Sequence, residues 1–221
     1  YFFCFSNKDL KFIKKYFKAN YLIYGSLRNN LASINKIRNK TNLLNYISEL
    51  TKNDRFEEHE KIILKILKNF CKKNNIKIHI TLRSNRNDKN MNREFEINYF
   101  RKILGQDFIY SDHDSYNIAE KSLINISRNS NLGFELVARG VKVLFLPAKQ
   151  DFLERSNPYF KKLSSEILET SHDYYKIEKK IKLIIKTSKQ KYFSLAKKTL
   201  NIFKYDKKIF FYIIQKCLGK R

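Results

Sequence analysis

Apolar and polar positions along the chain form two kinds of block. Short runs of consecutive apolar residues predict strands, because strands buried on both faces of a sheet read as nearly continuous apolar sequence. Longer segments with apolar residues three or four positions apart predict amphipathic helices, whose buried residues recur with a period near 3.6. The clearest of these is "EHEKIILKILKNFCKK" (58–73), which places Ile63, Ile66 and Phe70 on one face.

The two kinds of block alternate regularly from residue 43 to residue 146. The strand predictions are 43–48, 76–82, 107–110, 123–127 and 142–146, and the helix predictions between them are 58–73, 93–104, 115–122 and 131–138. Strands that alternate with helices at this pace favour a parallel sheet with helices on both faces. The sequence therefore predicts an α/β fold for this part of the chain.

The two ends of the chain differ from the central part. Residues 1–28 predict a strand, a helix and a second strand, and residues 29–42 are polar without a strong period, which predicts a linker or a crossover between domains. Residues 161–221 carry 17 Lys or Arg against 5 Asp or Glu and predict a basic helical tail. The predicted parts of the chain are therefore 1–42, 43–160 and 161–221.

The composition is that of a globular protein, with 43% hydrophobic and 14% aromatic residues. Lys and Arg number 46 against 21 Asp and Glu, and the net charge of +25 favours anionic partners such as nucleic acid, anionic lipid or phosphorylated small molecules. The charge is scattered rather than concentrated, and heavy use of Lys, Asn and Ile is also what an AT-rich coding bias produces. The charge by itself does not identify the partner.

Cysteine and histidine usage argues against a metal centre. Cys4, Cys71 and Cys217 lie far apart, which disfavours a disulfide framework or a zinc site and favours a reducing cytoplasm, and the four histidines have no metal-ligand spacing. No apolar run reaches the ~18 residues of a membrane span, and the first residues lack the pattern of a signal peptide. Because "YFFCFS" reads as a strand entered midway, we expect the chain to be a fragment of a longer protein.

The stretch "ISRNSNLGFELVARGVKVLFLP" (126–147) carries the candidate site. A strand that ends at Ser127 is followed by a polar turn and by a helix that starts near Ser130 or Asn131. Open parallel sheets bind ligands beyond the carboxyl ends of their strands, and the first amides of a helix attract anions such as phosphate. Ser130 can cap this helix and bind a phosphate oxygen. Gly133 would give a phosphate room for close approach, or would serve tight packing of the helix on the sheet.

Glu135 is an acid among mostly apolar helix residues. One interpretation is a carboxylate that accepts hydrogen bonds from the vicinal hydroxyls of ribose, as acidic residues do in nucleotide sites. The other is a solvated first-turn acid that interacts favourably with the helix dipole. The context of strand, turn, helix, glycine and strand makes a nucleotide site a moderately specific hypothesis.

The same residues carry a resemblance to a known family. "SRNSNLGFELVARGVKVLFL" (127–146) is similar to the nucleotide-sugar-binding half of GT-B glycosyltransferases. It most resembles bacterial surface-carbohydrate (O-antigen) biosynthesis proteins, in which a Ser-Thr-Leu-Gly-Tyr-Glu-like stretch precedes an Ala-Arg-Gly-Lys-Lys-Val run. The resemblance covers residues 20–147 and implies two Rossmann-like domains that face a cleft. Residues 1–42 would end the acceptor domain, and residues 43–160 would be the nucleotide-sugar-binding domain.

The resemblance implies roles for individual residues. It assigns the donor phosphate to Arg83, Ser130, Asn131 and Gly133, the ribose to Glu135, and the base to a loop with Asp112, His113 and Ser115. Arg83 would neutralise the charge of the leaving nucleotide, and its alternative is a solvated strand end. The alternatives for residues 112–114 are metal binding or acid–base work and a capped turn before Ser115. Asn131 stands where the family has a small hydroxyl residue, and the catalytic base is expected in the acceptor domain.

The function that the resemblance implies is transfer of a sugar from a nucleotide-sugar donor to a glycan or lipid-linked acceptor, without a metal or other cofactor. The protein would be cytoplasmic, and its basic tail would contact the anionic inner face of the membrane or simply face solvent. Ser26 and Arg28 would line the acceptor side of the cleft or form a plain crossover turn. Alternatives are a basic nucleic-acid-binding module without catalysis, against which the core spacing of the aromatic residues counts, and a two-domain nucleotide-sugar epimerase.

Overall fold

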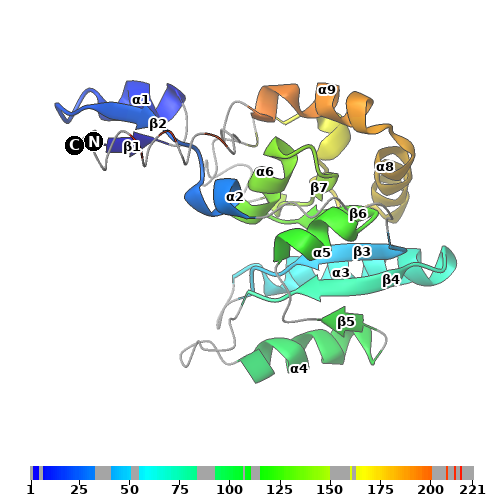
Figure 1. Cartoon of the computed structure of the whole chain (residues 1–221). Coiled ribbons are helices and arrows are strands. Elements are labelled where there is room, and N and C mark those ends of the chain that lie inside the picture. Colours follow the sequence, from blue (N-terminus) through cyan, green and yellow to red (C-terminus); the bar gives the residue numbers. More distant parts are fainter. Residues whose placement is uncertain are drawn as a thin grey trace.

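The structure is a computed structural model, and its largest part is a parallel sheet. It describes residues 2–4, 7–32, 41–50, 55–83, 93–106, 108–110, 115–149, 160, 163–200, 208, 212 and 215. Within these residues a fully parallel, five-stranded sheet has the order β5-β4-β3-β6-β7. Its strands are β3 (Leu43–Ile47), β4 (Lys77–Thr81), β5 (Phe108–Tyr110), β6 (Ile124–Ser127) and β7 (Val143–Phe145). All of them lie inside the segments predicted as strands, so the predicted α/β fold is confirmed (Figure 1).

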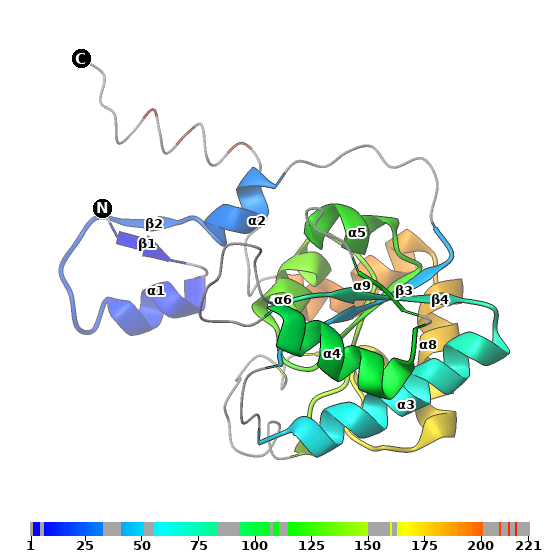
Figure 2. The same cartoon turned by 90° about the horizontal axis from the view of Figure 1, so that it is seen from below.

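Helices cover both faces of this sheet (Figure 2). One face carries α3 (Glu57–Lys73), α4 (Arg93–Leu104) and α8 (Tyr174–Lys186), and the other carries α5 (Ser115–Lys121), α6 (Asn131–Ala138) and α9 (Lys189–Leu200). On the first face Tyr46 of β3 packs edge-on against Phe100 of α4, with ring centroids 6.2 Å apart. Because both faces are covered, β3 and β6 are buried and read as apolar sequence.

A row of polar side chains crosses the buried sheet between β4, β3 and β6. Asn45 donates from Nδ2 to Oδ1 of Asn125 at 2.8 Å, and its own Oδ1 lies 2.9 Å from both His79 Nδ1 and Thr81 Oγ1. Asn125 in turn donates to the carbonyl oxygen of Ala119 at 3.0 Å. Since each buried polar group in this row has a partner, the row fixes the register of the strands instead of weakening the core.

A small separate unit lies at the N-terminal end (Figure 1). It contains β1 (Phe2–Cys4), α1 (Asn7–Ile13) and β2 (Tyr21–Ile23), with the two strands parallel. The short helix α2 (Leu27–Leu31) follows it, capped by Ser26, whose hydroxyl accepts a hydrogen bond from the amide of Asn29 at 3.2 Å. The predicted linker 29–42 therefore begins as helix, a feature too short to show a period. The division of the chain into three parts stays a prediction.

The basic segment after residue 160 packs onto the sheet through its helices. The buried hydroxyl of Tyr192 in α9 accepts from the amide of Val143 at 2.8 Å and donates to the carbonyl oxygen of the same residue at 3.1 Å. Phe193 lies against Gly140, which has a φ of +75°. Among the described residues, no helix combines the length and the apolar character needed to cross a membrane.

Candidate functional site

A cleft of about 490 Å³ lies at the carboxyl ends of β3, β4 and β6. Its walls come from the residues that follow these strands, from the starts of α5 and α6, and from α2. This is the crevice in which parallel sheets bind ligands. The candidate residues that line it are Arg83, Ser115, Ser130, Asn131 and Glu135. Asp112 and His113 lie outside the described residues.

The turn between β6 and α6 is held by two serines. Ser130 is the N-cap of α6, as predicted, and its hydroxyl accepts from the amide of Leu132 at 3.3 Å. Its own amide donates to Oγ of Ser127 at 3.2 Å. The amides of Asn131 and Gly133 belong to the first turn of α6, for which a helix supplies no carbonyl partner. This end of α6 therefore presents amide hydrogens and a positive dipole at the edge of the cleft.

Gly133 faces the sheet. A Cβ atom on this residue would lie 2.7 Å from Oγ of Ser127, 2.9 Å from Cβ of Ser127 and 3.0 Å from a ring carbon of Phe145. The tight packing of helix on sheet, which was the alternative interpretation of this glycine, is therefore what the structure shows. Gly133 is not among the residues that line the cleft, so its missing side chain serves packing on the sheet.

Glu135 is buried at the wall of the cleft, with 7% of its surface exposed. The hydroxyl of Ser26 donates to Oε1, and the hydroxyl of Tyr116 donates to Oε2. The interpretation of Glu135 as a solvated first-turn acid is wrong, because the side chain is buried and no acid lies in the first turn of α6. The carboxylate instead accepts hydrogen bonds from two hydroxyl groups that come from other elements.

Tyr116 stays protonated beside this carboxylate. Burial raises the pKa of its phenol, and the negative charge of Glu135 raises it further. Two guanidinium groups lie over its ring, that of Arg28 at 5.5 Å and that of Arg139 at 4.9 Å from the centroid. Arg139 also forms a buried ion pair with Glu120 at 3.0 Å. The two guanidinium groups lower the pKa of Tyr116, but burial and Glu135 have the larger effect, so the phenol remains the hydrogen-bond donor to Glu135.

The segment after β2 completes one wall of the cleft. Arg28 lines the cleft and donates to the hydroxyl of Ser115 at 3.3 Å, while Asn29 donates to the backbone carbonyl of Glu135 at 3.4 Å. Arg28 therefore contacts the cleft, whereas Ser26 lies behind the cleft wall, where it caps α2 and contacts Glu135. Their partners lie 87 to 109 residues away along the chain, so local sequence does not reveal them.

Arg83 is held at the end of β4 by one carboxylate and one backbone carbonyl. Its amide donates to Oε1 of the buried Glu96 at 2.8 Å, and its guanidinium donates to the backbone carbonyl of Glu49 at 3.2 Å. Its side chain lines the cleft and is exposed, so it is a strand-end residue that also faces the candidate site.

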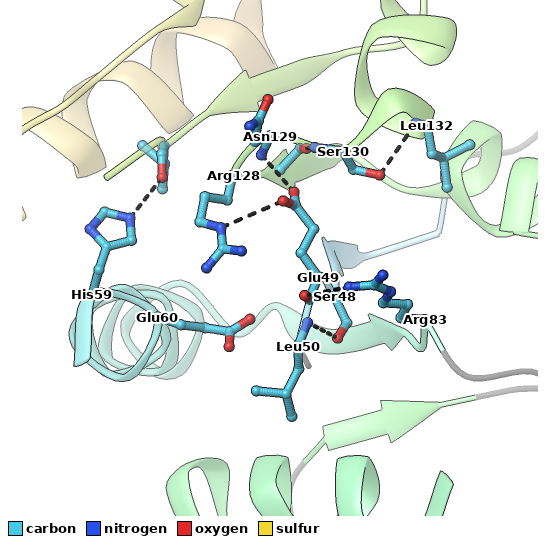
Figure 3. A network of polar contacts seen from close by, with 12 residues as sticks. Ser48, Glu49, Leu50, His59, Glu60, Arg83, Arg128, Asn129, Ser130 and Leu132 are labelled. Carbon is cyan, nitrogen blue, oxygen red and sulfur yellow. Dashed lines mark hydrogen bonds and ion pairs between the residues drawn. The ribbon is translucent and has the colours of Figure 1, made fainter. Parts of the chain in front are cut away.

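Glu49 and Arg128 were not among the predicted site residues. Both line the cleft, and Oε2 of Glu49 lies 3.5 Å from Nε of Arg128 (Figure 3). Oε1 of Glu49 accepts from the amide of Asn129 at 2.6 Å. Each of the two residues follows the end of a predicted strand, as Arg83 does, and this shared position is the signal that could have identified them.

The described residues contain no group of three or more His, Cys, Asp or Glu side chains that could hold a metal ion. His59 and His172 form a pair, with Nδ1 and Nε2 2.7 Å apart, and the other ring nitrogen of His59 lies 2.9 Å from the carbonyl oxygen of Leu146. A distance this short between two ring nitrogens is that of a hydrogen bond.

Comparison with protein families gives one match, and it covers most of the chain. A family model described as "putative O-antigen biosynthesis protein" matches residues 50–215. No curated protein matches.

Comparison with solved structures identifies the fold. S. aureus TarM, solved with fondaparinux, α-GlcNAc-glycerol and UDP, is 12% identical with a TM-score of 0.52, over 99% of this chain and 43% of that one. The wall teichoic acid polymerase TagF, soaked with CDPG, is 14% identical with a TM-score of 0.56, over 96% of this chain and 55% of that one. The chain thus spans about half the length of these structures, and its fold is that of GT-B glycosyltransferases, which confirms the resemblance found in the sequence.

Proposed function

The chain belongs to the family of O-antigen biosynthesis proteins, and we propose that it is the nucleotide-sugar-binding part of a GT-B glycosyltransferase. The enzyme moves a sugar from a nucleotide-activated donor to a growing bacterial surface glycan. The observation that carries this proposal is the buried carboxylate of Glu135, which accepts two hydroxyl hydrogen bonds at the wall of the cleft, next to the start of α6.

The ribose of the donor binds to Glu135. A carboxylate has two oxygens that accept hydrogen bonds, and ribose carries two vicinal hydroxyls, so the two groups fit each other. The two partners that Glu135 has in this structure are both hydroxyl groups. The carboxylate of Glu135 is therefore positioned to accept hydrogen bonds from hydroxyl groups.

The phosphates of the donor bind beside the ribose, at the start of α6. Ser130, Asn131 and Gly133 supply amides from the turn and the first helical turn, and Arg83 supplies a cation from the end of β4. During transfer the bond between the anomeric carbon and the phosphate oxygen breaks, and the nucleotide leaves with additional negative charge. Amides and a cation that are already in place stabilise this charge.

The new bond forms between the anomeric carbon and an acceptor hydroxyl oxygen, whose proton goes to a base that we expect in the acceptor domain. Ser115, at the start of α5, lies on the side of the cleft where we place the base of the nucleotide, next to the 112–113 loop. Neither a metal nor another cofactor takes part. The cleft orients the reactants and excludes water.

The acceptor is a glycan or a lipid-linked sugar on the cytoplasmic side of the membrane. Tyr175 of α8 is 79% exposed, and Lys176, Lys179 and Lys186 on the same helix are also exposed. Basic and aromatic side chains of this kind suit peripheral contact with anionic lipid at the inner face of the membrane. No specific nucleic acid is a partner in this proposal.

Thermal-shift measurements of the chain against a panel of nucleotides and nucleotide sugars test the proposal. At least one nucleoside diphosphate should raise the melting temperature, since a ligand that binds the folded state stabilises it. Glu135→Gln should abolish this shift, because an amide accepts fewer hydroxyl hydrogen bonds than a carboxylate. The matched control is Glu169→Gln, since Glu169 is a similarly buried acid away from the cleft, paired with Lys180 at 2.8 Å. It should keep the shift.

A 2′-deoxynucleotide gives a second readout. The unmodified chain should prefer the ribonucleotide, and Glu135→Gln should lose that preference. Stabilisation by no nucleotide, together with tight RNA binding that weakens steeply with salt, would replace this proposal with the nucleic-acid-binding alternative.

A further inference from the structure

Glu49 places a carboxylate inside the cleft, between the end of β3 and the turn after β6. Its Oε1 accepts from the amide of Asn129 at 2.6 Å, and its Oε2 lies 3.5 Å from Nε of Arg128. Only 15% of the Glu49 side chain and 10% of the Arg128 side chain are exposed. Figure 3 shows Glu49, in the segment after β3, pointing toward these two partners, with Ser130 beside them.

The groups that hold this carboxylate are groups that bind phosphate. A guanidinium forms strong charge-assisted hydrogen bonds with phosphate oxygens, and backbone amides ahead of a helix do the same. Asn129 directly precedes Ser130, the N-cap of α6. An anion on the amide of Asn129 is therefore adjacent to the place proposed for the donor phosphate.

Glu49 differs from two other acids near this region, Glu60 and Glu96. Glu60 accepts from the hydroxyl of Tyr46 at 2.9 Å, and Glu96 accepts from the amide of Arg83 at 2.8 Å. Both are 1% exposed and neither lines the cleft, so their hydrogen bonds stabilise the interior of the fold. Glu49 and Arg128, by contrast, both face the cleft together with Ser130. Their ion pair lies where a ligand can reach it.

We propose that Glu49 is an internal anion that occupies a phosphate subsite, formed by Arg128 and the amide of Asn129, until the donor displaces it. The inference rests on the proposed function and adds a competing carboxylate to its phosphate site. Glu49 opposes binding, since like charges about 4 Å apart repel by an amount that corresponds to roughly tenfold or more in affinity.

Isothermal titration of the chain with three series of ligands tests the subsite. Uridine, UMP and UDP form one series, and cytidine, CMP and CDP form the second, with adenosine, AMP and ADP as the third. Glu49→Gln keeps the size of the side chain and an oxygen that accepts from Asn129, but removes the charge. It should bind one of the diphosphates roughly tenfold more tightly than the unmodified chain does, with a smaller gain for the monophosphate and none for the nucleoside.

Two further variants make the result specific. Glu169→Gln removes a charge from a carboxylate of similar burial away from the cleft, so it should leave every affinity unchanged. Arg128→Gln should weaken the binding of the diphosphate more than that of the monophosphate and leave the affinity for the nucleoside unchanged. The melting curve of this variant must show that it is folded.

The outcomes separate the subsite from the function on which it rests. One outcome is that diphosphates bind the unmodified chain, but Glu49→Gln binds them no more tightly or gains as much affinity for the nucleoside. The inference about Glu49 is then wrong, and the proposed function stands. If no member of the three series binds either protein, the proposed function is wrong and the subsite falls with it.

Discussion

The hydroxyl of Ser26 donates a hydrogen bond to Oε1 of Glu135, a residue 109 positions further along the chain. The contact joins the turn after β2 to α6, and Asn29 adds a second link to the backbone carbonyl of Glu135. Arg139 adds a third, through the carbonyl oxygen of Ala32 at 3.3 Å. The N-terminal segment is therefore attached to the candidate site through the same residue that we assign to the ribose.

Ser26→Ala should loosen this attachment. The substitution removes the side-chain cap of α2 and one of the hydroxyl partners of Glu135, and the loss of a cap or of a partner to a buried charge costs about 1–3 kcal/mol. Amide hydrogen exchange in residues 26–32 should become faster by a factor of roughly 10 or more. Ser26→Thr retains the hydroxyl and should exchange nearly as slowly as the unmodified chain. Equal exchange in Ser26→Ala would contradict the importance of the contact.

Gly133→Ala should destabilise the fold, although alanine is the better helix former. The new Cβ would collide with Ser127 and Phe145, and overpacking of this kind costs typically 1–3 kcal/mol against a propensity gain of about 1 kcal/mol. Urea unfolding measures the difference. Ser127→Ala removes the Oγ atom that lies 2.7 Å from the new Cβ, so the double variant should lose less stability than the sum of the single ones. A stabilising Gly133→Ala would show that the helix does not pack this tightly.

Tyr192→Phe should destabilise the edge of the sheet. The hydroxyl of Tyr192 pairs with both the amide and the carbonyl of Val143, and its loss leaves two buried groups without these hydrogen bonds. Each such group costs about 1–3 kcal/mol. Tyr175→Phe, at a residue that is 79% exposed, should change the free energy of unfolding by less than about 0.5 kcal/mol. Equal stability of the two variants would refute the role given to the Tyr192 hydroxyl.

His59 should make stability depend on pH. Burial lowers the pKa of His59 below its ordinary value of 6.5, and His172 and Arg128 act in the same direction, although the hydrogen bond with the carbonyl of Leu146 opposes them. The folded state therefore binds this proton less readily than the unfolded state does. The stabilisation is present above pH 6.5 and is lost as the pH falls through the lower folded-state pKa.

Urea unfolding between about pH 8 and pH 5 tests this dependence. The free energy of unfolding of the unmodified chain should decrease as the pH is lowered. In His59→Gln the decrease should be smaller. An identical slope in both proteins would show that His59 titrates alike in the folded and unfolded states.

Local sequence located most of the helices and strands, but it did not give the order of the strands in the sheet. The apolar runs located β3 to β7, because strands covered on both faces are mostly apolar, even though Asn45, His79 and Asn125 are buried polar residues in them. The order β5-β4-β3-β6-β7 was not predicted, since neighbouring strands are chosen by packing between distant segments. The helix α2 was missed because five residues are too few to show a period.

The candidate site was predicted in part. Ser130 could be recognised as a cap because capping depends on the residues that directly follow it. The environment of Glu135 could not, since both of its hydroxyl partners belong to other elements. Glu49 and Arg128 each look like an ordinary charged residue after a strand, and their pairing depends on β3 lying beside β6.

The sequence by itself determined where most of the helices and strands form and which turn precedes α6, because spacing and capping act over a few neighbouring residues. Only the tertiary structure decided that Gly133 faces the sheet, that Glu135 is buried against Ser26 and Tyr116, and that Glu49 sits in the cleft against Arg128. These features require segments far apart along the chain to meet, and burial and charge pairing are set where they meet.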